Sequence, residues 1–338
     1  MTVIAVGTAK GGYLLEADYS IRSAGLFPGW KVTAWAGTPD GGALAALASN
    51  WFGASLQRST DLDTWKPFGE APSYDDDRPL EQIWTLTPAD GVLYAGVEEA
   101  GLFRSSDGGS TWEGVVALND LGARRRWMPG LGGLCAHHVL ADGDRLMVAI
   151  SAVGVFRSDD RGASFTKVDQ GVTTAVEPTD DLDEGHCVHS IVAQPDDPDR
   201  LWRQDHTGVY RTTDGGAQWD RIEVGLPASF GFPIGRDAAS ARLFVVPMES
   251  DQNRVSAGGR FRVYRSDDDG DSWQVSGTGW DDSPAYDTVL RNAMATDGNG
   301  SVVVGTTGGN LWHTPDGGDH WTRADLQLPR VLSVEFVG

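Results

Sequence analysis

A short pattern recurs along the chain: a Ser or Thr, an Asp two residues later, a Gly two residues after that, and a closing aromatic residue. Five copies fit it, at 105–112, 158–165, 212–219, 266–273 and 314–321. A sixth copy, at 59–65, is one residue shorter and lacks the glycine. A motif repeated at near-constant spacing indicates a fold assembled from similar supersecondary units.

The residues around each copy predict a β-hairpin. A strand-like run such as 101–104 (Gly-Leu-Phe-Arg) precedes the motif. In the motif the aspartate is suited to accept N–H groups of a turn, the glycine permits positive φ, and the aromatic ring packs against the neighbouring sheet. Two further strand-like runs lie upstream, for example 83–87 and 92–97. Each repeat therefore predicts four antiparallel strands, which is the blade of a β-propeller.

The closing aromatic residues recur every 47 to 54 residues, and we expect an all-β, seven-bladed β-propeller with four-stranded antiparallel blades. The segment 1–32 lacks a first strand, and we expect 330–338 to supply it, which closes the ring and removes exposed edges. Trp30 is placed at the closing position of this split blade. We predict a single domain, 1–338, whose other blades span about 33–68, 80–116, 133–169, 186–224, 230–276 and 289–324.

On these motifs the chain resembles the Asp-box, or BNR-repeat, propellers, a superfamily that includes sialidases, xyloglucan-cleaving hydrolases, the sortilin luminal domain and photosystem II assembly factors. The resemblance covers essentially the whole chain. The resemblance implies the propeller fold, but it does not indicate whether the function is sugar hydrolysis, peptide binding or assembly.

Charge and cysteine usage exclude several classes of partner. The chain has 27 basic and 48 acidic residues, a net charge of -21, so we expect neither nucleic acid nor an anionic membrane surface as a partner. No apolar run is long enough to span a membrane. Two cysteines in 338 residues do not make a disulfide framework, and the amino-terminal residues do not resemble a signal peptide. We expect a cytoplasmic protein.

The long connections fall at one end of the predicted blades. In a propeller the first strand starts at this end and the second returns to it, so the site of function is expected here. The connections are 71–81, 117–134, 171–185, 247–259 and 277–288.

Histidine and cysteine concentrate in two consecutive blades at the same end. If residues alternate along a strand, Cys135 shares a face with His137, and Cys187 with His189. Imidazole and thiolate groups suit a divalent transition metal, or acid–base chemistry. The alternative is that they simply fill crowded strands. The predicted metal ligands are Cys135, His137, His186, Cys187 and His189.

Arginines at the same end favour an anionic ligand, because guanidinium groups match carboxylate or phosphate. The predicted substrate-binding residues are Arg78, Trp84, Arg203, Arg291 and Arg330, and Phe230, Phe232 and Trp280 are expected as further aromatic walls. The arginines resemble the sialidase triad. However, the Phe/Tyr-Arg-Ile-Pro segment of that family is missing.

Carboxylates are also abundant there. Glu98 and Asp205 lie at strand ends, and with His206 they are the predicted catalytic acid, base or ligand groups. The other carboxylates expected at this end are Glu81, Glu99, Glu249, Asp251 and the runs 75–77 and 180–184. The runs are expected to be solvated loop faces.

These observations predict that a His- and Cys-lined pocket at the end of the propeller axis binds, and with a metal transforms, a small polar or anionic molecule, as a hydrolase or lyase would. Two alternatives remain open: a non-catalytic scaffold that grips a protein partner on the same face, and a sialidase-like glycoside hydrolase.

Overall fold

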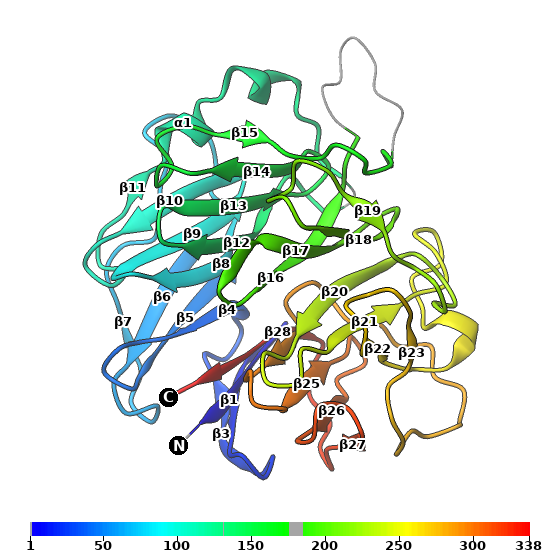
Figure 1. Cartoon of the computed structure of the whole chain (residues 1–338). Helices are drawn as coiled ribbons and strands as arrows, with labels where there is room; N and C mark the ends of the chain where they lie inside the picture. The colour runs from blue at the N-terminus through cyan, green and yellow to red at the C-terminus, as the bar shows by residue number, and fades with distance from the viewer. Residues whose placement is uncertain (1, 131, 176–184) are drawn as a thin grey trace. The chain divides into compact units, whose positions relative to one another are not determined.

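The computed structural model describes residues 2–130, 132–175 and 185–338. Within these residues the strands form seven four-stranded antiparallel sheets (Figure 1). The prediction of an all-β, seven-bladed β-propeller is confirmed. No helix in the described part of the chain is long and apolar enough to cross a membrane.

The chain divides into two compact units, of which the first comprises Met1–Asp169, Thr174–Val188 and Glu335–Gly338. It contains four sheets and two short helices. The sheets are β28 (Val331–Val337), β1 (Val3–Thr8), β2 (Gly11–Leu15) and β3 (Ile21–Leu26); β4 (Lys31–Gly37), β5 (Ala43–Ser49), β6 (Gly53–Ser59) and β7 (Lys66–Pro67); β8 (Gln82–Ala89), β9 (Val92–Glu98), β10 (Gly101–Ser105) and β11 (Glu113–Gly114); and β12 (Ala136–Asp142), β13 (Arg145–Ile150), β14 (Gly154–Ser158) and β15 (Thr166–Lys167). The helices are α1 (Val116–Asn119) and the 3-10 helix η1 (Gly122–Arg126).

The second unit comprises Gln170–Thr173 and His189–Val334. It is built on three sheets and the 3-10 turn η2 (Ala257–Gly259). The sheets are β16 (Val188–Gln194), β17 (Asp197–Asp205), β18 (Gly208–Thr212) and β19 (Asp220–Arg221); β20 (Gly231–Arg236), β21 (Leu243–Pro247), β22 (Tyr264–Ser266) and β23 (Gln274–Val275); and β24 (Met294–Thr296), β25 (Val302–Gly305), β26 (Leu311–Thr314) and β27 (Thr322–Arg323).

The last strand of the chain pairs with the first. Figure 1 shows β28 beside β1, and the sheet order β28-β1-β2-β3 confirms the predicted closure. The placement of Trp30 was wrong. Trp30 follows the fourth strand β3 instead of preceding it, and its ring lies 5.9 Å from that of Phe52. In a full copy the closing aromatic, such as Trp112, directly precedes the fourth strand, whereas the residue directly before β3 is Ser20.

The repeated motif forms the turn between the third and fourth strands of a blade. In the first full copy, Ser105 Oγ donates to Asp107 Oδ1 (2.7 Å) and accepts from Gly109 N (2.8 Å). Asp107 Oδ1 also accepts from the N–H groups of Ser110 and Thr111. These hydrogen bonds, with one from the Thr111 hydroxyl, hold the pKa of Asp107 well below its usual range. Gly109 has φ +96°, as predicted for this position.

Bulges occur near the start of three first strands in the first unit. The register shifts between Val32 and Ala34 in β4, between Ile83 and Thr85 in β8, and between Ala136 and His138 in β12. The extra residues are Thr33, Trp84 and His137. A bulge redirects the side chain it carries, so the predicted alternation that placed Cys135 and His137 on one face does not hold across this point.

Candidate functional site

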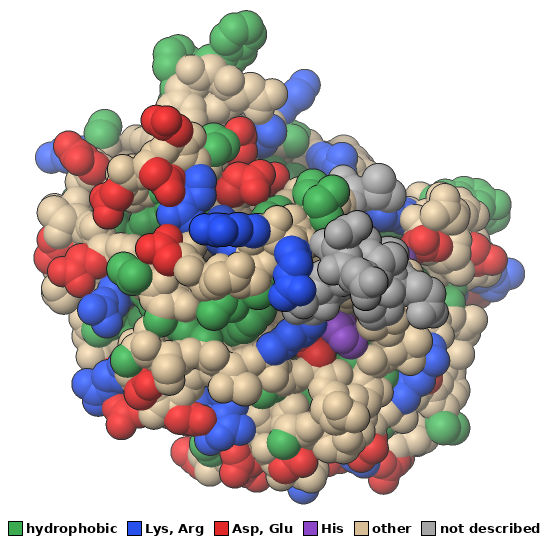
Figure 2. Space-filling view, turned by 90° about the horizontal axis from the view of Figure 1, so that it is seen from above, with side chains coloured by type: hydrophobic (Ala, Val, Ile, Leu, Met, Phe, Trp, Pro, Cys, Tyr) green, Lys and Arg blue, Asp and Glu red, His purple; other side chains and the backbone are tan. Residues whose placement is uncertain are grey.

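Two histidines of the second unit lie side by side. His189 belongs to β16, and His206 directly follows β17; their ring centroids are 5.7 Å apart. His189 is buried, whereas His206 is partly exposed. The two strands are neighbours in one sheet, and this brings residues 17 positions apart in sequence together. Figure 2 shows one face of the molecule, on which a histidine reaches the surface between acidic and basic side chains.

Each imidazole is oriented by an acceptor on one nitrogen. His189 Nδ1 lies 2.6 Å from the carbonyl oxygen of Gly231. Because a carbonyl only accepts, Nδ1 carries the proton, and the neutral ring then has its lone pair on Nε2. His206 Nε2 lies 3.4 Å from Asp251 Oδ2, which favours the proton on Nε2 and the lone pair on Nδ1.

Cys187 completes a group of three metal-binding side chains. It immediately precedes β16 and is two residues from His189, so the local chain itself sets its position. One ligand atom from each of Cys187, His189 and His206 lies within 4.8 Å of the others. Two of the predicted metal ligands therefore meet, together with the predicted catalytic residue His206.

The other three predicted ligands do not join a group of three among the described residues: Cys135, His137 and His186. The Cys135 thiol faces the carbonyl oxygen of Gly132 at 3.3 Å. His137 is fully buried in the β12 bulge, where its ring is 6.3 Å from that of Trp84. His186 is half-buried, just before Cys187.

Aromatic rings and two guanidinium groups lie against the histidines. The His189 ring centroid is 5.3 Å from that of Phe230 and 4.8 Å from that of Phe232. The Phe232 ring lies beneath the Arg291 guanidinium at 4.8 Å and that of Arg254 at 5.6 Å. Phe230, Phe232 and Arg291 thus lie near the histidines, and their roles in binding a ligand stay predictions. Arg254 and Arg291 place two positive charges over Phe232 on a chain whose net charge is -21.

Arg203 and Asp205 form an ion pair inside the second unit. Both side chains are 0% exposed, and the guanidinium also lies 5.2 Å from the Trp219 ring centroid. A catalytic acid or a substrate-binding cation has to reach its ligand. The burial of this pair favours a structural role for both residues.

In the first unit, Glu98 ends β9 and accepts hydrogen bonds from two side chains of β8. Gln82 Nε2 donates at 2.9 Å and Trp84 Nε1 at 3.0 Å, both to Glu98 Oε2. Glu98 was predicted as a catalytic group and Trp84 as a substrate-binding residue, and a hydrogen bond joins the two side chains. It is the Trp84 N–H, placed by the β8 bulge, that fixes this carboxylate.

The remaining predicted arginines are Arg78 and Arg330. Arg78 is bound by the carboxylates of Asp76 and Asp120 and by the carbonyl oxygen of Asn119, and it stacks over Tyr74, so it ties a loop of the first unit together. Arg330 is exposed at the residue before β28.

The sequence did not predict some features of the site, and one predicted feature lies outside the described residues. Asp251 was expected only as one of many carboxylates at this end, and the Gly231 carbonyl carries no signal in sequence. Both contact a histidine that is distant along the chain. The acidic run 180–184 lies outside the described residues.

Fold and site together define a β-propeller with a candidate metal site at Cys187, His189 and His206. No protein-family model matches the chain, and no curated protein matches it. Among solved structures, YCF48 from Cyanidioschyzon merolae is similar at 14% identity and a TM-score of 0.57, covering 89% of this chain and 87% of that one.

A structure of YCF48 bound to D1 peptide is similar at 13% identity and a TM-score of 0.55, covering 87% and 82% of the two chains. An ancestral GH74 enzyme is similar at 15% identity and a TM-score of 0.55; the match covers 90% of this chain but 38% of the enzyme. Such likeness shows the propeller fold alone.

Proposed function

We propose that this chain binds a divalent transition metal ion, zinc foremost, through Cys187, His189 and His206. The observation that carries the proposal is that both imidazoles are held through one nitrogen, by the Gly231 carbonyl and the Asp251 carboxylate. Histidines that bind metals in proteins are oriented in this way. One thiolate and two imidazoles are a donor set that suits zinc.

The ligand of such a site would be a small anionic molecule. Three protein ligands leave the fourth position of a tetrahedral ion for water or a ligand atom, and a bound zinc ion supplies a Lewis acid there. Arg254 and Arg291 add two positive charges beside Phe232. Guanidinium groups bind carboxylate and phosphate through paired N–H donors, so these arginines favour an anion at that position.

Metal titration tests the proposal. Apo protein titrated with ZnCl2 in a calorimeter should bind one equivalent, and Co²⁺ should give the charge-transfer absorption of a thiolate ligand. Cys187→Ser should abolish that absorption, and His206→Gln should weaken binding about 10-fold or more. The control His320→Gln removes an exposed histidine elsewhere and should bind like the wild type. Absence of stoichiometric binding, or identical binding by all variants, would contradict the proposal.

Anion binding is tested with inorganic phosphate and acetate on the zinc-loaded protein. Arg254→Gln should raise the dissociation constant about 10-fold, since a charged hydrogen bond contributes about 1.5–3 kcal/mol. The matched control Arg260→Gln removes an exposed arginine that pairs with Asp282. Equal anion affinity in both variants would rule out a role for Arg254.

Protein binding is the second candidate. The segment that contains α1 and η1 exposes two apolar side chains, Val116 (66%) and Met128 (58%), beside Arg125. The similar YCF48 propeller has been solved with a D1 peptide. A photo-crosslinker at position 128 should capture one partner in cells, and Arg125→Glu should reduce the capture. Capture that is unchanged by this variant would count against the segment.

Three broader expectations accompany the proposal. The motif turns support membership of the Asp-box propellers, because two hydrogen bonds recur in every full copy: from the Ser or Thr hydroxyl to the Asp carboxylate, and from the Gly N–H to that hydroxyl. A cytoplasmic location is proposed because two cysteines in 338 residues do not make a disulfide framework. Glycoside hydrolysis is the weaker alternative, because the buried Asp205 is poorly placed to serve as one of the two carboxylates that it needs.

A further inference from the structure

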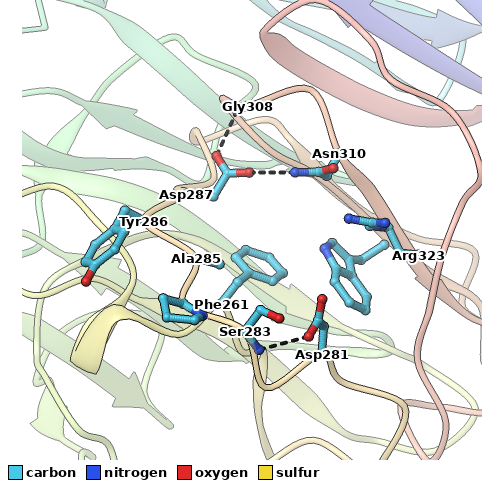
Figure 3. A pocket seen from close by; sticks show the side chains of 11 residues that line it. Phe261, Asp281, Ser283, Ala285, Tyr286, Asp287, Gly308, Asn310 and Arg323 are labelled. Atoms are coloured by element: carbon cyan, nitrogen blue, oxygen red, sulfur yellow. Dashed lines mark hydrogen bonds between the residues drawn. The ribbon is translucent and has the colours of Figure 1, made fainter.

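A cavity of about 360 Å³ opens in the second unit, between the segment 281–287 and the hairpin of β25 and β26 (Figure 3). None of its lining residues belongs to the candidate metal site. Its volume lies at the lower end of the range of about 300–1,000 Å³ that is typical of small-molecule pockets. Residues of both segments and of β27 line it, among them Phe261, Asp281, Tyr286, Asn310, Trp312 and Arg323.

Aromatic rings form the apolar wall of this cavity. Phe261 and Trp312 are nearly parallel, with an interplanar angle of 23° and centroids 5.9 Å apart. Trp280 packs behind Trp312 at 5.0 Å and stacks on Trp321 at 5.2 Å. Trp280 Nε1 donates to the carbonyl oxygen of Ser276, which fixes the ring. The wall is therefore rigid before any ligand arrives.

Asp287 joins the two segments that enclose the cavity. Its Oδ1 accepts from Gly308 N (2.7 Å) and from Thr307 Oγ1 (3.0 Å), and its Oδ2 accepts from Asn310 Nδ2 (3.1 Å); Figure 3 shows the bonds to Gly308 and Asn310. These bonds hold the 281–287 segment against the hairpin of β25 and β26. A cavity held in this way loses little conformational entropy on binding.

The rim offers both donors and acceptors at balanced charge. Asp281 presents a carboxylate that accepts from Ser283 N at 2.8 Å. Arg323 is exposed and is the strand partner of Trp312 in the pairing of β26 with β27. The charged residues of the lining are Asp281, Asp287 and Arg323. Because Asp287 is already bonded to Thr307, Gly308 and Asn310, one carboxylate and one guanidinium face a ligand at the rim. A net cation or anion gains little from such a rim.

We propose that this cavity is a second binding site that takes one ring of a neutral sugar. A pyranose has an apolar face suited to the aromatic wall and a circle of hydroxyl groups. Each hydroxyl both donates and accepts, so it can pair with the Asp281 carboxylate and the Arg323 guanidinium together. A purely apolar ligand would leave those groups without hydrogen bonds.

The test uses saturation-transfer NMR and tryptophan fluorescence with D-glucose, D-galactose, D-xylose and N-acetyl-D-glucosamine on the full chain. For a ligand of this size we expect a dissociation constant on the order of 1 mM for at least one sugar. Asp281→Ala and Arg323→Ala, both at exposed positions, should each weaken binding about 10-fold. The control Asp325→Ala removes an exposed carboxylate outside the lining and should have no effect.

The outcomes separate cleanly. Saturable binding that both rim variants weaken supports the site. Binding that survives both variants places the sugar elsewhere, and the absence of saturable binding by any of the four sugars overturns the proposal. Tighter binding of choline or adenosine than of any sugar would also overturn it. The titrations are repeated with a chelator, which removes any metal ion from the candidate metal site. Because no residue of this cavity belongs to that site, sugar binding should be unchanged by the chelator.

Discussion

The ion pair of Arg203 and Asp205 gives the sharpest stability prediction. Both side chains are fully buried, and the guanidinium also lies over Trp219. Asp205→Ala removes the carboxylate that faces the buried Arg203 guanidinium, and breaking a buried ion pair in this way costs about 3–5 kcal/mol. We therefore expect the free energy of unfolding to fall by that amount.

Urea unfolding followed by tryptophan fluorescence measures the loss. The double variant Arg203→Met with Asp205→Leu removes both charges and should recover most of the stability. Asp144→Ala is the matched control, because it breaks the exposed pair with Arg161 and should cost about 0–1 kcal/mol. If Asp205→Ala cost no more than Asp144→Ala, the buried pair would not have the structural role that its geometry indicates.

Three further predictions concern the turns, the half-buried His138 and the closure. Gly109→Ala should lower stability by about 1–2 kcal/mol, since φ is +96° and a Cβ would lie 3.2 Å from Leu93 Cδ2; an unchanged melting temperature would contradict this. Burial lowers the pKa of His138 to about 4 in the folded protein, whereas the pKa of a histidine in the unfolded chain is near 6.5. As the pH drops, the unfolded chain therefore binds this proton first. The free energy of unfolding should fall as the pH drops from 6.5 towards 4. His138→Gln should flatten that slope in unfolding curves, and an unaltered slope would exclude His138 as its source. Deleting 331–338 should expose β1 as a sheet edge and cause aggregation in size-exclusion chromatography, whereas deletion of Gly338 alone should not; a monomer of native stability would refute the closure.

The fold was predictable because its signal is local. In each motif copy the serine or threonine, the aspartate and the glycine interact within five residues, so the turn can be recognised without knowing what surrounds it. The closure by β28 was predictable for a different reason: a blade with a missing strand needs a partner for its exposed edge. Trp30 shows the limit of this approach, because an aromatic residue near the expected position is not by itself a closing residue.

The candidate site was predictable only in part. Clustering of histidine and cysteine pointed to His189, His206 and Cys187, and the structure brings these three together. Strict alternation along β12 failed at His137, because a one-residue bulge changes which face a side chain occupies. The acceptors that orient the imidazoles, Gly231 and Asp251, come from other strands and loops, and sequence spacing carries no such long-range information.

The sequence did not predict the cavity that we propose as a sugar-binding site. Trp280 was expected to be an aromatic wall, but its partners Phe261 and Trp312 come from other elements of the second unit. The hydrogen bonds of Asp287 that enclose the cavity depend on how two segments pack, and the sequence marks only the length of the 277–288 connection.

The central claim is the metal site, and an anomalous-scattering map of crystals grown with one equivalent of ZnCl2 tests it most directly. We predict a single peak at the zinc edge bonded to Cys187 Sγ at about 2.3 Å and to His189 Nε2 and His206 Nδ1 at about 2.0–2.1 Å. A protein that shows no peak at these three side chains, or whose zinc lies only at other residues, would contradict the account.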